Sequence, residues 1–103
     1  MRVYEITFAK GGIPYDFHRE VGEEFGGFTF RRNVGGWFNG RELEVEDSYT
    51  YQVCVDSRQE ASVTREKMHA LAERIRRFYG QASVMVSEQI ANVSFIEGER
   101  NGG

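Results

Sequence analysis

The sequence is poor in the residues that form covalent or metal cross-links. It holds one cysteine, Cys54, and two histidines, His18 and His69, in 103 residues. A disulfide needs two cysteines, and structural zinc or iron–sulfur sites need several thiolate or imidazole ligands. The composition therefore argues against a disulfide framework and an iron–sulfur cluster, and we expect neither a metal site nor a bound cofactor.

Long apolar runs and a strong excess of one charge are also missing. The longest apolar run is about three residues, far short of the roughly 20 that span a bilayer, and residues 1–5 lack the apolar segment of a signal peptide. The net charge of −3 argues against broad binding to the backbone of nucleic acids. We therefore expect a cytoplasmic protein without a membrane partner and without broad nucleic-acid binding.

What the chain does contain suffices for one hydrophobic core. Forty per cent of the residues are hydrophobic and 14% are aromatic, within a length that fits a single domain. We expect residues 1–97 to form that domain and residues 98–103 to be a disordered tail.

Alternation of apolar and polar residues predicts the strands, since successive side chains of a strand point to opposite faces. This pattern occurs over 2–10, 28–34 and 49–55. A further β-rich stretch covers 83–96, in which Glu88–Gln89 is either a tight turn or a bulge in one long strand.

Apolar residues three or four positions apart predict two helices, over 14–25 and 63–79. Ser57 or Ser62 is the expected N-cap of the second helix, because a serine oxygen can accept a hydrogen bond from a free amide of the first turn. Three glycines within 35–40 predict a loop or a bulged strand end after the second strand.

The expected order of elements is β-α-β-β-α-β. This is the split βαβ arrangement of ferredoxin-like domains, in which a four-stranded antiparallel sheet carries both helices on one face. The sequence thus predicts an α+β fold of ferredoxin-like type. The other face of the sheet has no helix to cover it, so we expect a homo-oligomer.

One segment resembles a known group of proteins. Residues 78–86, which read Phe-Tyr-Gly-Gln-Ala-Ser-Val-Met-Val, are similar to a stretch of small uncharacterised ferredoxin-like proteins of bacterial and phage genomes. The aromatic-rich first strand and the hairpin before the last helix add to this resemblance. It implies a compact, oligomeric accessory protein, with inhibition or sequestration of a host component as its natural role, and it implies no catalytic residue.

The best candidate binding site is the stretch 31–41, where arginines, aromatic residues and glycines occur together. Arginine binds phosphate or carboxylate, an indole stacks on a base, and glycine lets a ligand approach the backbone. A nucleotide-like ligand or a host protein is therefore the expected partner. In a purely structural interpretation, the aromatics cap the core and the arginines pair with Glu42, Glu44 and Glu46. The candidate binding residues are Arg31, Arg32, Asn33, Trp37, Phe38, Asn39 and Arg41.

Candidate catalytic residues are few. Tyr15, Asp16 and His18 cluster near the start of the first helix, and an aspartate–histidine pair can act as a general base. At helical spacing, however, Asp16 and His18 point in different directions, which favours a solvated helix face. We therefore assign no catalytic residue from the pattern.

The leading hypothesis from the sequence is a non-catalytic binding protein that acts through 31–41 and a tyrosine-rich sheet surface. The alternative is a small dimeric enzyme that acts on an aromatic or acidic metabolite, with Tyr15, Asp16, His18 or Arg31 as its candidate groups. A nucleotide triphosphatase is excluded, because neither of the glycine-rich phosphate-binding motifs is present.

Overall fold

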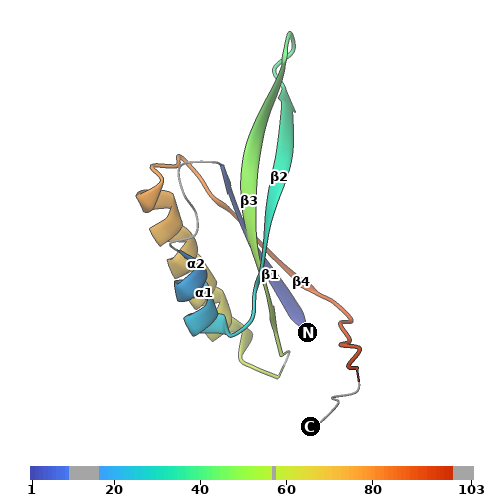
Figure 1. Ribbon diagram of the computed structural model, residues 1–103. Helices are drawn as coiled ribbons and strands as arrows, with labels where there is room; N and C mark the ends of the chain where they lie inside the picture. The colour runs from blue at the N-terminus through green and yellow to red at the C-terminus, as the bar shows by residue number, and fades with distance from the viewer. Residues whose placement is uncertain (10–16, 57, 99–103) are drawn as a thin grey trace.

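The structure, a computed structural model, describes residues 1–9, 17–56 and 58–98. Two helices lie on one side of a four-stranded antiparallel sheet whose strand order is β2-β3-β1-β4 (Figure 1). This architecture confirms the predicted α+β fold of ferredoxin-like type. Along the chain the elements are β1 (Arg2–Ala9), α1 (His18–Phe25), β2 (Thr29–Phe38), β3 (Leu43–Val55), α2 (Ala61–Phe78) and β4 (Met85–Ile90).

Strand pairing sorts the side chains onto two faces of the sheet. β1 pairs with β3 so that Tyr4 lies opposite Val53 and Ile6 lies opposite Tyr51. These side chains face the helices, whereas Thr7 and Thr50 occupy the uncovered face, which we call the open face. The buried cluster between sheet and helices consists of Tyr4, Ile6, Phe8, Phe17, Val21, Tyr49, Tyr51, Val53, Val55, Met68, Leu71, Ala72 and Ile75.

β2 and β3 continue past the rest of the sheet as a two-stranded ribbon. β1 pairs with β3 only between Ser48 and Val55, whereas β2 pairs with β3 from Gln52 to Leu43. Residues 34–47, which we call the arm, therefore project beyond the helices (Figure 1). The molecule is elongated as a result, with extents of 57 × 30 × 26 Å.

The arm corrects the prediction of a loop over 35–40. β2 runs on to Phe38 because Gly35 and Gly36 pair with Glu46 and Val45, and a glycine backbone still donates and accepts ladder hydrogen bonds. β3 likewise begins at Leu43, six residues before the predicted start. Its charged residues alternate with apolar ones, so a strand can leave the charges exposed.

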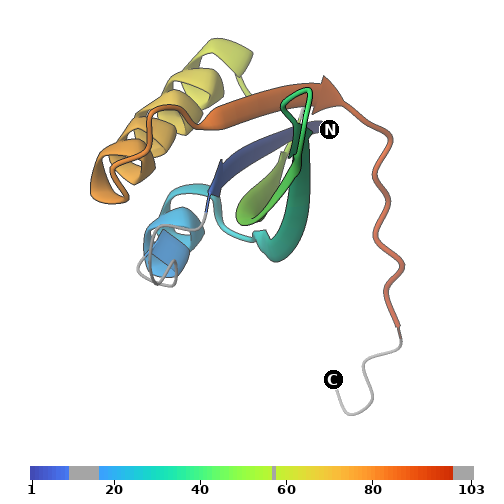
Figure 2. The same ribbon diagram turned by 90° about the horizontal axis from the view of Figure 1, so that it is seen from above.

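Other predicted boundaries also need correction. Glu88 pairs with Tyr4 and Gln89 with Val3 in regular register, so β4 has neither a turn nor a bulge there. The chain leaves the strand after Ile90 instead of continuing to 96, and Figure 2 shows the following segment running away from the sheet.

The helix boundaries differ from the predicted ones as well. The N-cap of α2 is Glu60, without a side-chain hydrogen bond, so Ser62 lies inside the first turn. Ser57 and the predicted start of the first helix lie outside the described residues. Within the described ranges, neither helix is long and apolar enough to cross a membrane.

Packing of α2 against the sheet makes a prediction for stability. Leu71 is 1% exposed within the core cluster, so Leu71→Ala should lower the free energy of unfolding by about 2–5 kcal/mol through lost burial and a residual cavity. Glu66→Ala, at an exposed position of the same helix, should change it by less than about 0.5 kcal/mol. Urea unfolding measures both, and equal effects would contradict the placement of α2.

Candidate functional site

The seven predicted binding residues do not converge on one site. Alternation along β2 places Arg31, Asn33 and Trp37 on the open face of the sheet, whereas Arg32 and Phe38 point to the side of the helices. Asn39 and Arg41 belong to the hairpin turn at the tip of the arm. Only part of the predicted set can therefore contact one ligand.

Arg31 and Asn33 are engaged in a polar network on the open face. Arg31 Nη2 donates to Glu5 Oε2 at 2.9 Å, and Gln52 Nε2 donates to the other oxygen of Glu5 at 2.9 Å. Asn33 Nδ2 donates to Thr50 Oγ1 at 2.8 Å, which gives the buried Thr50 hydroxyl a partner. These bonds join three strands, so Arg31 and Asn33 serve the sheet.

Arg32 and Asn39 also have structural partners. Arg32 Nη2 lies 2.6 Å from Asp47 Oδ2, and this hydrogen-bonded carboxylate raises the pKa of Arg32. The Asn39 side-chain oxygen accepts the backbone amides of Arg41 and Glu42 at 3.0 and 2.9 Å, which closes the turn. Arg31 and Arg32 thus pair with Glu5 and Asp47, so the glutamate partners that the structural interpretation gives these two arginines are wrong.

Trp37 is the predicted residue that does line a hollow. Its side chain is 66% exposed, so it does not cap the core. On the open face of the arm it pairs with Glu44, and two residues earlier Gly35 pairs with Glu46. Because Gly35 has no side chain, a hollow of about 400 Å³ forms beside Trp37, Glu44 and Glu46.

A second hollow lies where the arm meets the sheet. Its volume is about 420 Å³, and Glu46 borders this hollow as well as the first. We call the two hollows together the arm groove. The lining of the second hollow consists of Thr7, Phe8, Ala9, Glu46, Ser48, Gln81, Ala82, Ser83 and Met85.

The arm groove combines an aromatic ring, two carboxylates and a mixture of polar and apolar side chains. Among the described residues, neither Glu44 nor Glu46 takes part in an ion pair; Glu44 accepts a long hydrogen bond of 3.4 Å from Asn39. Available carboxylates attract a cationic group, and an exposed indole face stacks on a base or contacts a cation. The sequence pattern predicts Glu44 and Glu46 only as partners for arginine, and their place in the arm groove follows from the pairing of β2 with β3.

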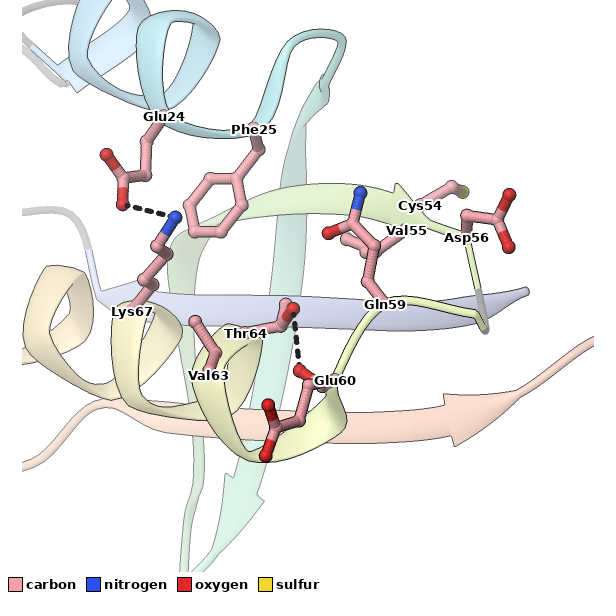
Figure 3. Close-up of a pocket in the computed structure, with 10 residues that line it drawn as sticks. All are labelled: Glu24, Phe25, Cys54, Val55, Asp56, Gln59, Glu60, Val63, Thr64 and Lys67. Atoms are coloured by element: carbon pink, nitrogen blue, oxygen red, sulfur yellow. Dashed lines mark hydrogen bonds and ion pairs between the residues drawn. The ribbon is translucent and has the colours of Figure 1, made fainter.

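Another pocket, of about 330 Å³, lies between the end of α1, the end of β3 and the start of α2 (Figure 3). Three of its four charged lining residues form ion pairs, and the fourth, Glu60, accepts a hydrogen bond from Ser62. Glu24 lies 3.6 Å from Lys67, and Asp56 lies 2.7 Å from Arg58. The hydrogen bond from Arg58 lowers the pKa of Asp56 to about 2. A charged ligand would have to displace these pairs, which makes this pocket the weaker candidate.

The candidate base His18 lies in an aromatic cluster. Its Nδ1 is 2.7 Å from the Tyr51 hydroxyl, and its ring packs against Phe28 and Phe30. These contacts fix α1 to the sheet. The other two candidate catalytic residues, Tyr15 and Asp16, lie outside the described residues.

Comparisons with known proteins bear on the function. No protein-family model matches the chain, and no curated protein matches it in sequence. Among solved structures it is similar to a phage SAM lyase in complex with S-methyl-5'-thioadenosine, with a TM-score of 0.67, 16% identity, and coverage of 85% of this chain and 79% of that chain. The apo state of a phage SAM lyase gives a TM-score of 0.60 at 18% identity, covering 85% and 78% of the two chains.

The chain is also similar to a variant of CutA1 from Pyrococcus horikoshii OT3. That structure gives a TM-score of 0.57 at 11% identity, with coverage of 91% of this chain and 87% of that chain. At these identities the likeness establishes the fold. The similarity to a phage SAM lyase nevertheless contradicts the leading hypothesis of a non-catalytic binding protein, because that neighbour is an enzyme. The alternative hypothesis of a small enzyme agrees better with this finding.

The ion pair between Asp56 and Arg58 makes a testable prediction. Because Arg58 holds the pKa of Asp56 at about 2, Arg58→Ala should raise it toward the ordinary value of 3.8. Carbon-13 NMR titration of the Asp56 carboxyl group measures this change. Arg65→Ala, which removes a guanidinium bound to Glu88, should leave the pKa of Asp56 unchanged. An unshifted Asp56 in the Arg58 variant would show that the pair does not form.

Proposed function

We propose that the chain is an enzyme that cleaves an adenosyl sulfonium compound of the S-adenosylmethionine (SAM) class in the arm groove. The observation that carries this proposal is the similarity, over 85% of the chain, to a phage SAM lyase in complex with S-methyl-5'-thioadenosine. The chemistry of the arm groove supports it independently, because such a substrate combines an aromatic base with positive charge.

Each part of the substrate has a suitable contact in the arm groove. The adenine ring would stack on Trp37, where base–aromatic stacking contributes about 1–3 kcal/mol. The hydroxyl of Ser48 and the amide of Gln81 line the groove and can bond the ribose hydroxyls or the base edge. The ammonium group of the amino-acid chain would lie near the carboxylates of Glu44 and Glu46.

The expected reaction breaks one carbon–sulfur bond. S-methyl-5'-thioadenosine differs from SAM by the four-carbon amino-acid chain, so its formation requires cleavage between sulfur and that chain. The bonding electron pair goes to sulfur, which becomes a neutral thioether. The four-carbon fragment balances the step either by ring closure, in which its own carboxylate bonds to the carbon that left sulfur, or by loss of a proton.

The change in charge during this step indicates which contacts help catalysis. The sulfonium loses its charge in the transition state, so a carboxylate beside it would stabilise the substrate more than the transition state. The ammonium group keeps its charge throughout, so Glu44 and Glu46 can hold it without that cost. We therefore place the sulfonium in the second hollow, near Phe8 and Met85.

We also propose that the chain acts as a homo-oligomer. The arm groove lies at the surface of a single copy, where water would solvate the sulfonium and oppose the loss of its charge. A second copy that packs along the edge of β3, beside the second hollow, would exclude part of that water.

The activity is tested by incubating the purified protein with SAM. We expect SAM to disappear and S-methyl-5'-thioadenosine to accumulate in equal amount, measured by liquid chromatography with mass spectrometry. Ring closure and proton loss give four-carbon products of the same formula, so chromatographic retention against standards of the lactone and of the unsaturated amino acid distinguishes them. A run in oxygen-18 water shows whether water adds to either product. SAM that decays no faster than in buffer would refute the proposed activity.

Two variants test the site. Trp37→Ala should weaken binding of both SAM and S-methyl-5'-thioadenosine at least about tenfold, because both contain adenine. Glu46→Gln should weaken binding of SAM alone, because S-methyl-5'-thioadenosine has no ammonium group. Isothermal titration calorimetry measures the product, and steady-state kinetics measure the KM for SAM.

The matched control is Glu42→Gln, which removes the same charge from the tip of the arm, outside the two hollows. It should bind both compounds as the unmodified chain does. If Glu42→Gln and Glu46→Gln weaken SAM binding equally, the effect is one of net charge, and the assignment of Glu46 is wrong.

A further inference from the structure

Most of the large apolar side chains that the structure leaves exposed fall into two groups. The first is the arm patch, on the face of the arm that continues the core side of β2 and β3. The second is the edge patch, along β4 and the segment after it. The arm patch consists of Val34, Phe38, Leu43 and Val45, each at least 60% exposed, and the edge patch of Met85, Ile90, Phe95 and Ile96, each at least 61% exposed.

Each patch adjoins a strand edge without a neighbour. In the arm, residues 43–47 of β3 extend past the end of β1 and have no strand on that side among the described residues. β4 is the last strand of the sheet, so its outer edge is also open. Unpaired amides and carbonyls along such edges pair readily with another strand.

The usual protection of an edge strand is weak in β4. Lysine, proline and bulges discourage pairing, but β4 reads Met-Val-Ser-Glu-Gln-Ile, with regular register and a single charge. That charge, Glu88, is bound by Arg65 at 2.8 Å and by Arg2 at 3.2 Å. It also accepts a hydrogen bond from the Tyr4 hydroxyl at 3.3 Å. The Glu88 side chain therefore points to the helix side, where it does not prevent another strand from pairing with the edge.

The charges beside the two edges are complementary. The arm carries three glutamates, Glu42, Glu44 and Glu46, and a single arginine, Arg41. Beside β4, two arginines surround one glutamate. A contact between two arms through the open face would oppose rows of carboxylates, whereas a contact between an arm and a β4 edge joins charges of opposite sign.

We propose that the arm of one copy of this chain packs on the β4 edge of a second copy, with residues 43–47 pairing along 85–90. Both halves of the interface belong to this chain, so a second copy supplies what each patch lacks. The contact is heterologous, because two different surfaces meet, and it continues from copy to copy until it closes into a ring. This inference deepens the proposed homo-oligomer and does not depend on the proposed activity.

Two variants test the two sides of the interface one at a time. Leu43→Asp combined with Val45→Asp disables the arm patch, and Ile90→Asp disables the edge patch. Each should convert the oligomer into a monomer in light scattering coupled to size-exclusion chromatography, without any ligand. Val63→Asp is the matched control, because Val63 is 45% exposed on α2, outside both patches. It should leave the assembly intact, and circular dichroism verifies that every variant is folded.

Mixing the two disabled variants gives the decisive result. The arm of the Ile90→Asp variant is intact, and so is the β4 edge of the Leu43→Asp/Val45→Asp variant. The mixture should therefore form a dimer through one functional interface, although neither variant associates alone. Hydrogen exchange should show protection of the amides in 43–47 and 85–90 in the wild type and loss of that protection in each variant.

Three results would overturn the proposal. If the wild type stays monomeric up to its solubility limit, the proposed interface does not form. An Ile90→Asp variant that stays assembled, or a mixture that forms no dimer, shows that another contact joins the copies. Because association is measured without SAM, failure of the interface appears in light scattering and failure of the activity appears in the SAM assay, so the two results are read separately.

Discussion

The pairing of β2 with β3 beyond the end of β1 is the constraint on which the candidate site depends. A two-stranded ribbon is at most marginally stable in water when nothing packs on it. Here the ribbon begins inside a four-stranded sheet, where Thr50 joins Thr7 and Asn33 through hydrogen bonds of 2.8 Å. The sheet thus fixes the register at the base, and the register fixes which arm residues share a face.

That register gives the two faces of the arm different chemistry. Trp37, Glu44 and Glu46 lie on the open face, and Phe38, Leu43 and Val45 on the other. A shift of one residue would exchange these sets, because side chains alternate along a strand. The polar network around Thr50 therefore supports both the ligand site and the interface, and one of its members, Thr7, also lines the second hollow.

The fold could be predicted from the sequence because its main signals are periodic. Tyr4, Ile6 and Phe8 alternate, and Met68, Leu71, Ala72 and Ile75 follow a helical spacing, so strand and helix were both identifiable. The arm was not predictable in the same way. Its glycines are typical of a loop, and pairing across the hairpin outweighs that preference. Strand ends such as Ile90 depend on the length of the partner, which a single sequence does not reveal.

The candidate site was predictable only in part. Trp37 was identified from its type and neighbours, but its companions Glu44 and Glu46 come from the opposite strand, and their pairing follows from a register that the sequence leaves open. Arg31 and Arg32 were assigned to a ligand because arginine binds anions, yet the fold supplies Glu5 and Asp47 as partners. Residue type indicates what a side chain can bind, and tertiary structure decides whether it is available.

Trp37 is the single tryptophan of the chain, so its fluorescence reports on the arm groove alone. The most direct test of the account is a titration of the protein with S-methyl-5'-thioadenosine, followed by tryptophan emission with calorimetry in parallel. If adenine stacks on Trp37, the emission changes with the same saturation curve as the heat of binding. Binding detected by heat, with unchanged emission, would place the ligand elsewhere and contradict the arm groove as the site.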